Sequence, residues 1–193
     1  TAQVTVLTMM AFLLGRKRGA LSQERYEQLV ESLLRVPDMI GRVLQDEAHI
    51  RDVSKAYQLA QNAIYLGRGY LYPVALEGAL KLKEISYIHS ESYAAGELKH
   101  GAIALIHPGT PVITVCTQPE WLHKTLLNLS ECRARGAECV CFCLPHMEKD
   151  ARAAADHVFL LPDMPPLLAP IVSVIPLQLL AYHAACAKNL DVD

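Results

Sequence analysis

The stretch AIYLGRGYLYPVALEGALKLKEISYIH, residues 63–89, decides the fold. It opens with the short apolar run Ala63–Leu66, whose length and residue types are typical of a buried strand. The turn Gly67-Arg68-Gly69 follows, and Pro73 then begins a long segment with helical composition. Proline is tolerated in the first turn of a helix because its missing N–H would have no helical partner there. We therefore interpret the stretch as one strand–turn–helix unit.

The same alternation continues downstream. We expect helices at 119–135 and at about 167–189, and further strands at Pro111–Cys116, Glu138–Leu144 and His157–Leu161. Four strand-like runs separated by helices or long crossovers predict a parallel sheet that is covered on both faces. The predicted fold class is α/β, a three-layer sandwich with a parallel, flavodoxin- or Rossmann-like sheet.

The residues upstream of this unit have a helical character. The first segment is apolar through Leu14, turns basic at residues 16–18 and breaks at Gly19, which suits a helix C-terminus. Ser22 is a plausible N-cap for a second helix, which we expect to end at Pro37, and a weaker helical stretch runs over about 40–60. We therefore expect a helical arm over 1–60, followed by one α/β lobe over 61–193.

The composition excludes several classes of function. The net charge is −2, so the chain has no basic surplus with which to bind nucleic acid. Cys139, Cys141 and Cys143 alternate along one predicted strand and point the same way, so we interpret them as buried reduced thiols in a cytoplasmic protein. No zinc-type spacing is present, and we expect no metal and no cofactor. The charge-free stretch 164–187 is long enough to span a bilayer, but four prolines interrupt it, and we expect a core helix rather than a membrane contact.

One helix face carries charged residues that could perform acid–base chemistry. Glu77, Lys81 and Glu84 are spaced i, i+4, i+7 and fall within roughly 40° of one another around the helix. Two carboxylates beside an ammonium can hold one carboxylate ionised as a base, although such runs are more often a paired, solvated face. His100, in GELKHG, is by itself more often a surface or capping residue. The Gly67-Arg68-Gly69 turn could approach an anion, but is more often only a tight connection.

The block ALEGALKLKEISYIHSESYAAGELKHG, residues 75–101, closely resembles the most characteristic segment of the glucosamine-6-phosphate synthase family, the glutamine–fructose-6-phosphate aminotransferases. The similarity continues through 133–142 and 167–193, and the opening TAQVTVLTMM resembles the end of the family's first sugar-isomerase lobe. The resemblance implies the second sugar-isomerase (SIS) lobe of an enzyme that makes glucosamine 6-phosphate from fructose 6-phosphate and glutamine.

The resemblance also implies roles for individual residues. Glu84 corresponds to the base that moves a proton between C1 and C2 of the sugar, and Lys81 and Glu77 belong to the same site. His100 corresponds to a histidine that the family supplies to the neighbouring subunit, where it assists ring opening of fructose 6-phosphate. A homodimer is therefore expected, and the charge-free terminal helix favours the same conclusion.

The chain departs from the family pattern by what it lacks. The glutaminase domain, the first lobe with its phosphate-binding loop, and the tail with an imine-forming lysine are all missing, and the corresponding loop here reads CTQPEW. We therefore expect the chain alone to be inactive. Two alternatives remain open at this stage: a stand-alone phosphosugar isomerase or deglycase of the same superfamily, and a non-catalytic phosphosugar-binding or dimerisation module.

Overall fold

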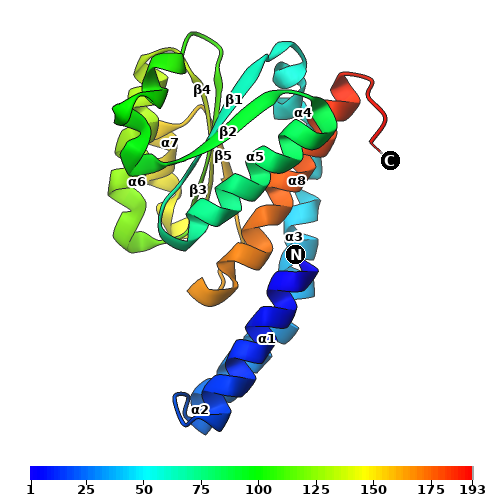
Figure 1. Cartoon of the computed structure of the whole chain (residues 1–193), viewed down its shortest axis with the longest axis vertical. Coiled ribbons are helices and arrows are strands. Elements are labelled where there is room, and N and C mark those ends of the chain that lie inside the picture. The colour runs from blue at the N-terminus through cyan, green and yellow to red at the C-terminus, as the bar shows by residue number, and fades with distance from the viewer. Residues whose placement is uncertain (193) are drawn as a thin grey trace.

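The computed structural model describes residues 1–192 and has at its centre a parallel sheet of five strands (Figure 1). The strands lie in the order β2-β1-β3-β4-β5, and every neighbouring pair is parallel. Their bounds are β1 Asn62–Gly67, β2 His89–Ala94, β3 Pro111–Cys116, β4 Glu138–Cys143 and β5 His157–Leu160. β3 and β4 are buried almost throughout, as expected for strands covered on both faces. The predicted α/β fold with a parallel sheet is confirmed.

Helices cover both faces of this sheet. Figure 1 shows α6 (Pro119–Ala134) and α7 (Glu148–Ala154) on one face, and α5 (Tyr72–Ser86) and α8 (Ala169–Ala187) on the other. Behind α8 lie α3 (Val36–Gln45) and α4 (Glu47–Ser54), which both contact it. The short 3-10 helices are η1 Lys55–Leu59, η2 Gly69–Leu71, η3 Ala95–His100, η4 Ala102–Leu105, η5 Pro145–Met147 and η6 Pro166–Leu168.

The chain begins with a helical hairpin that extends away from the sheet. α1 (Ala2–Lys17) and α2 (Gln23–Leu34) form its two arms, as the blue end of the ribbon in Figure 1 shows. Gly19 has φ +71, which lets the chain turn between the helices, and the Ser22 side chain accepts a hydrogen bond from the Arg25 N–H. The predicted end of the first helix and the Ser22 N-cap are both confirmed. The second helix ends at Leu34 rather than at Pro37, which lies in the first turn of α3, where proline is tolerated. The weak stretch over 40–60 is not one helix but most of α3, then α4 and η1.

The main error of the sequence prediction concerns residues 87–94. We expected the helix to run to His89, whereas α5 ends at Ser86 because Tyr87 adopts a left-handed conformation with φ 58. The next residues form β2, a fifth strand that the apolar pattern missed. β2 lies at the edge of the sheet and reads HSESYA, so it lacks the apolar run of a central strand.

The charge-free stretch near the C-terminus is a core helix. Residues Pro166–Ala187 are long and apolar enough to cross a membrane, but 67% of an 18-residue apolar stretch within them is buried inside the protein. α8 packs on α5 and α4, so other helices of the same chain cover much of its apolar surface.

All six cysteines are free thiols, and five of them are buried. Burial raises the pKa of Cys116, Cys132 and Cys139 to about 12, so these thiols stay protonated at neutral pH. The interpretation of the alternating cysteines as small apolar core residues is thus confirmed for Cys139, Cys141 and Cys143, which are fully buried.

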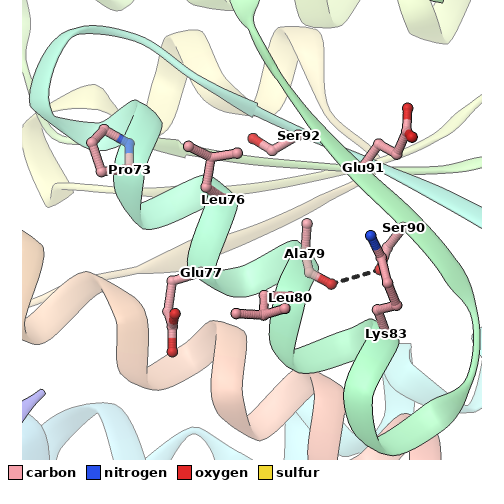
Figure 2. Close-up of a pocket in the computed structure, with 9 residues that line it drawn as sticks. All are labelled: Pro73, Leu76, Glu77, Ala79, Leu80, Lys83, Ser90, Glu91 and Ser92. Atoms are coloured by element: carbon pink, nitrogen blue, oxygen red, sulfur yellow. Dashed lines mark hydrogen bonds between the residues drawn. The ribbon is translucent and has the colours of Figure 1, made fainter.

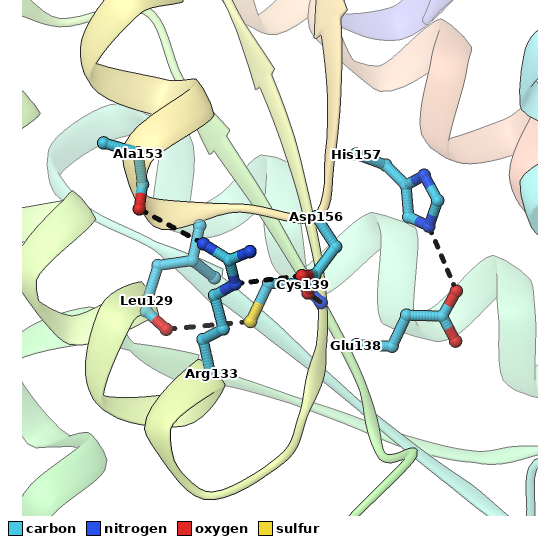
Figure 3. A network of polar contacts seen from close by, with 7 residues as sticks. All are labelled: Leu129, Arg133, Glu138, Cys139, Ala153, Asp156 and His157. Carbon is cyan, nitrogen blue, oxygen red and sulfur yellow. Dashed lines mark hydrogen bonds and ion pairs between the residues drawn. The ribbon is translucent and has the colours of Figure 1, made fainter.

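A polar network ties the amino ends of β4 and β5 to α6 (Figure 3). The Asp156 carboxylate accepts hydrogen bonds from Arg133 Nε and from the Cys139 N–H, both at 2.9 Å. Arg133 also donates to the Ala153 carbonyl at 3.2 Å, and His157 Nε2 lies 3.2 Å from Glu138 Oε1. Asp156, just before β5, therefore joins the end of α6 and the start of β4, which lie 23 and 17 residues earlier in the chain.

We expect Asp156→Ala to lower the free energy of unfolding by about 1–3 kcal/mol, because the partly buried Cys139 N–H loses its acceptor. Urea denaturation of the chain measures this change. The matched control is Asp163→Ala, whose side chain is 79% exposed and lies 4.0 Å from His146 Nδ1, and we expect it to change stability by less than about 0.5 kcal/mol. Equal effects of the two substitutions would contradict the role given to Asp156.

Candidate active site

α5 brings the three predicted charged residues together on one face. Lys81 Nζ lies 2.6 Å from Glu84 Oε2 and 3.8 Å from Glu77 Oε1. The side chains are partly exposed, at 41% for Glu77, 33% for Lys81 and 48% for Glu84. The predicted cluster exists, and its lysine bridges both carboxylates.

The electrostatics of the cluster favour the charged form of Lys81. The hydrogen bond to Glu84, followed by the charges of Glu77 and Glu84, raises the pKa of Lys81 above its usual range. Ion pairs this exposed contribute little to stability. The arrangement fits a lysine that holds the Glu84 carboxylate in one position.

The position of α5 is set by close packing at two glycines. A Cβ atom at Gly78 would lie 2.6 Å from Leu177 Cδ1 on α8 and 2.9 Å from Tyr65 Cε1 on β1. A Cβ atom at Gly67 would lie 2.6 Å from the Leu71 carbonyl oxygen and from Tyr72 Cα. The absence of side chains lets α5 begin directly against β1 and lie close to α8. These contacts fix the height of the charged face above the sheet.

A groove of about 610 Å³ lies between α5 and β2 (Figure 2). Its lining residues are Pro73, Leu76, Glu77, Ala79, Leu80, Lys83, Ser90, Glu91 and Ser92. Glu77 is the one member of the charged cluster in this lining, and its carboxylate in Figure 2 points away from Glu91 on the strand. The Ser90 hydroxyl donates to the Ala79 carbonyl at 2.7 Å and thereby ties the strand to the helix. The sequence did not predict the groove because it did not predict β2, which forms one of its walls.

Glu77 also faces a second hollow, of about 280 Å³, at the start of α5. That hollow lies between α1, α5 and α8 and is lined by Thr1, Gln3, Val4, Tyr70, Pro73, Val74, Glu77, Pro170 and Val174. Glu77 therefore borders both hollows, whereas Lys81 and Glu84 are in the lining of neither.

His100 lies apart from the cluster. It ends η3, which packs against α6, and Figure 1 shows α6 on the opposite face of the sheet from α5. The imidazole is 73% exposed, with its Nε2 atom 4.0 Å from Glu97 Oε2. Within residues 1–192, no hydrogen bond or ion pair joins His100 to Glu77, Lys81 or Glu84. One chain thus brings three of the four predicted site residues together and leaves the fourth on another surface.

Side chains fill the Gly67–Gly69 turn, which could have approached an anion, and the loop after β3, which stands where the family has its phosphate-binding loop. The Arg68 side chain is directed toward Asn128 of α6, with Nη2 donating to Oδ1 at 3.2 Å. After β3, Thr117 and Gln118 are almost fully buried, and Gln118 Nε2 donates to Glu120 Oε1 at 3.0 Å. Among the described residues, no group of three or more His, Cys, Asp or Glu could hold a metal ion.

Comparison with known sequences places this geometry in a family. The family profile described as the SIS domain matches residues 57–188. The chain is 46% identical over all 193 residues to a protein of Bacteroides thetaiotaomicron named glutamine–fructose-6-phosphate aminotransferase [isomerizing], of which it covers 31%. It is 45% identical over the same length to the protein of that name from Bordetella pertussis and covers 32% of it. The chain therefore spans about a third of the length of these curated relatives.

A solved structure agrees with these matches. The C-terminal domain of glucosamine-fructose-6-phosphate aminotransferase from Francisella tularensis superimposes with a TM-score of 0.91 at 38% identity. The match covers 97% of this chain and 52% of that one. The strand order, the helix layers and the sequence profile all lead to one conclusion: the chain belongs to the SIS domain family.

Proposed function

We propose that this chain is the second SIS lobe of the isomerase module of a glucosamine-6-phosphate synthase. The lobe spans 61–193 and the helical arm 1–60 leads into it. The whole protein would convert fructose 6-phosphate and glutamine to glucosamine 6-phosphate and glutamate in the cytoplasm. The rest of such a protein would supply the glutaminase domain, the first lobe with its phosphate-binding loop, and the imine-forming lysine. The observation that carries the proposal is the Lys81 bridge between Glu84 and Glu77.

In this proposal Glu84 is the general base of the isomerisation. Its carboxylate takes a proton from C1 of the open-chain sugar. The electron pair of the C–H bond moves into the C1–C2 bond, and the π pair of the C2 carbonyl, or of the imine that ammonia forms there with loss of water, moves onto the C2 heteroatom. The carboxylic acid formed then returns the proton to C2, while the proton of the C1 hydroxyl passes to the C2 heteroatom and an aldehyde forms at C1, so atoms and charge balance over the two steps. A single carboxylate can serve both sites because C1 and C2 are adjacent.

Lys81 and Glu77 hold that carboxylate in position. The short contact from Lys81 Nζ to Glu84 Oε2 fixes one oxygen of the Glu84 carboxylate, which leaves the other free for the proton. Glu77 holds the lysine from the other side at 3.8 Å. Lys81 also places a positive charge near the oxygen that becomes negative as C1 loses its proton.

His100 is proposed to act in the neighbouring subunit of a homodimer, where it assists ring opening of fructose 6-phosphate. Its place beside α6, across the sheet from the charged face of α5, supports this assignment, because it leaves His100 remote from Glu84 of its own chain. The isolated chain would then be inactive.

Mixed dimers of the whole protein test the proposal. Homodimers with Glu84→Gln or with His100→Ala should each be strongly impaired in forming glucosamine 6-phosphate. A heterodimer with one variant in each subunit should regain one of its two sites, because the intact Glu84 and the intact His100 meet in that site. Tandem affinity tags isolate the heterodimer for a product assay. Activity no greater than that of the two homodimers would exclude sharing of His100 between subunits.

A further inference from the structure

The segment that carries His100 is held to the body of the domain at its buried side chains. Ala95 and Leu98 of η3 are completely buried. Lys99, next to His100, forms an ion pair with Glu131 of α6, with Nζ 2.7 Å from Oε1. These contacts fix the two ends of η3 and leave the exposed imidazole at its tip.

Gly96, near the start of η3, contacts the guanidinium group of Arg68. A Cβ atom added at Gly96 would lie 3.3 Å from Arg68 Nη2 and 3.4 Å from Nη1. The Cζ atom would be farther away, at 3.7 Å, so the edge of the guanidinium that carries the two Nη atoms faces Gly96, and a side chain there would require a shift of a few tenths of an ångström. Arg68 follows β1, so this contact joins the loop of His100 to the end of a central strand.

Arg68 is itself fixed by groups of α6. Its Nη2 atom donates to Asn128 Oδ1 at 3.2 Å, and its Cζ atom lies 5.6 Å from the centre of the Trp121 ring. The Nε atom is buried and has no hydrogen-bond partner. Burying an arginine against an amide and an aromatic ring, with one donor unsatisfied, costs free energy. Such a cost is typical of a group kept for function rather than for stability.

We propose that Arg68 is a positioning residue for His100, acting through the backbone of Gly96. This inference rests on the proposed function of His100. The Nη edge of the guanidinium sets the position of η3 relative to α6 and β1, and the imidazole four residues beyond the contact depends on that position. A lysine at position 68 keeps the charge but loses both the two-nitrogen edge and the contact of the guanidinium with the Trp121 ring.

The test uses the whole protein with two independent substitutions, Arg68→Lys and Gly96→Ala. Arg68→Lys removes the support, and Gly96→Ala pushes the loop away from it without changing Arg68. We expect each to lower kcat for glucosamine 6-phosphate formation by about 10- to 100-fold, the effect of a displacement near 1 Å in a catalytic group. KM for fructose 6-phosphate and the rate of glutamine hydrolysis should not change. In a His100→Ala background, neither substitution should lower kcat further.

Two matched variants control for general damage. Gly41→Ala adds a methyl group where nothing lies within 4 Å, and Arg152→Lys changes an arginine that pairs with Glu148 on α7. Neither should change kcat. Two results would overturn the inference. In the first, Arg68→Lys and Gly96→Ala both keep full kcat while His100→Ala is impaired. In the second, both substitutions reduce kcat further in the His100→Ala background. Full activity of His100→Ala itself would overturn the proposed role of His100 and this inference with it. Should Arg68→Lys fold poorly, Gly96→Ala alone decides between these outcomes.

Discussion

Replacing Glu84 with glutamine in the whole protein should abolish sugar isomerisation while glutamine hydrolysis continues. Glutamine is almost isosteric with glutamate, and its amide can still contact Lys81, which approaches Glu84 Oε2 at 2.6 Å. The amide cannot accept a proton from carbon at neutral pH, so the proton transfer between C1 and C2 loses its base. Loss of a general base typically costs about 10²–10⁴-fold in rate. Formation of glucosamine 6-phosphate and release of glutamate are measured side by side.

The control for this experiment is Glu148→Gln on α7. Glu148 also forms a partly exposed ion pair, with its Oε1 atom 2.7 Å from Arg152 Nη2, but it lies on the opposite face of the sheet from the charged cluster. We expect unchanged isomerisation in that variant. Isomerase activity within a few-fold of normal in Glu84→Gln would exclude Glu84 as the base. Equal losses in both variants would point to damage of the fold instead.

Lys81→Met separates the positioning of Glu84 from its chemistry. Methionine has a similar length and leaves the packing of α5 largely intact, but it removes the ammonium group that lies 2.6 Å from Glu84 Oε2 and 3.8 Å from Glu77 Oε1. We expect kcat for glucosamine 6-phosphate formation to fall by about 10- to 100-fold while glutamine hydrolysis continues, because the Glu84 carboxylate loses the contact that holds it in place. An unchanged kcat would show that Lys81 does not position Glu84.

The sequence was sufficient for the parts of the fold that local pattern determines. The apolar runs of β3 and β4 and the Pro73 start of α5 predicted the parallel sheet, because central strands and helix starts have signals within a few residues. β2 escaped prediction for a physical reason. An edge strand is covered only in part, so HSESYA needs no apolar run, and its place beside β1 follows from the end of α5 at Tyr87.

The candidate site could likewise be predicted from the sequence only in part. The spacing of Glu77, Lys81 and Glu84 determines their common face, because all three lie on one helix. The separation of His100 from that face depends on β2 forming the edge strand and on η3 packing against α6. No local sequence pattern encodes either contact. The Arg68–Gly96 contact joins residues from two loops and could be found only in three dimensions.

The glycine between β1 and α5 gives the sharpest test of how the site is positioned. We expect Gly67→Ala to lower the free energy of unfolding by about 3 kcal/mol or more, at the upper end of overpacking costs. The added Cβ would lie 2.6 Å from the Leu71 carbonyl oxygen and from Tyr72 Cα, which are backbone atoms and cannot rotate away as a side chain would. The whole start of α5 must therefore move, and the charged face moves with it.

Gly41→Ala in α3 is the matched control, because its methyl group meets no atom within 4 Å and alanine is preferred to glycine inside a helix by about 1 kcal/mol. Opposite shifts of the urea midpoint, down for Gly67→Ala and up for Gly41→Ala, are the expected result. A Gly67→Ala variant as stable as the unmodified chain would mean that β1 and α5 do not need this close approach, and that the position of Glu84 is set by the α8 contact at Gly78 alone.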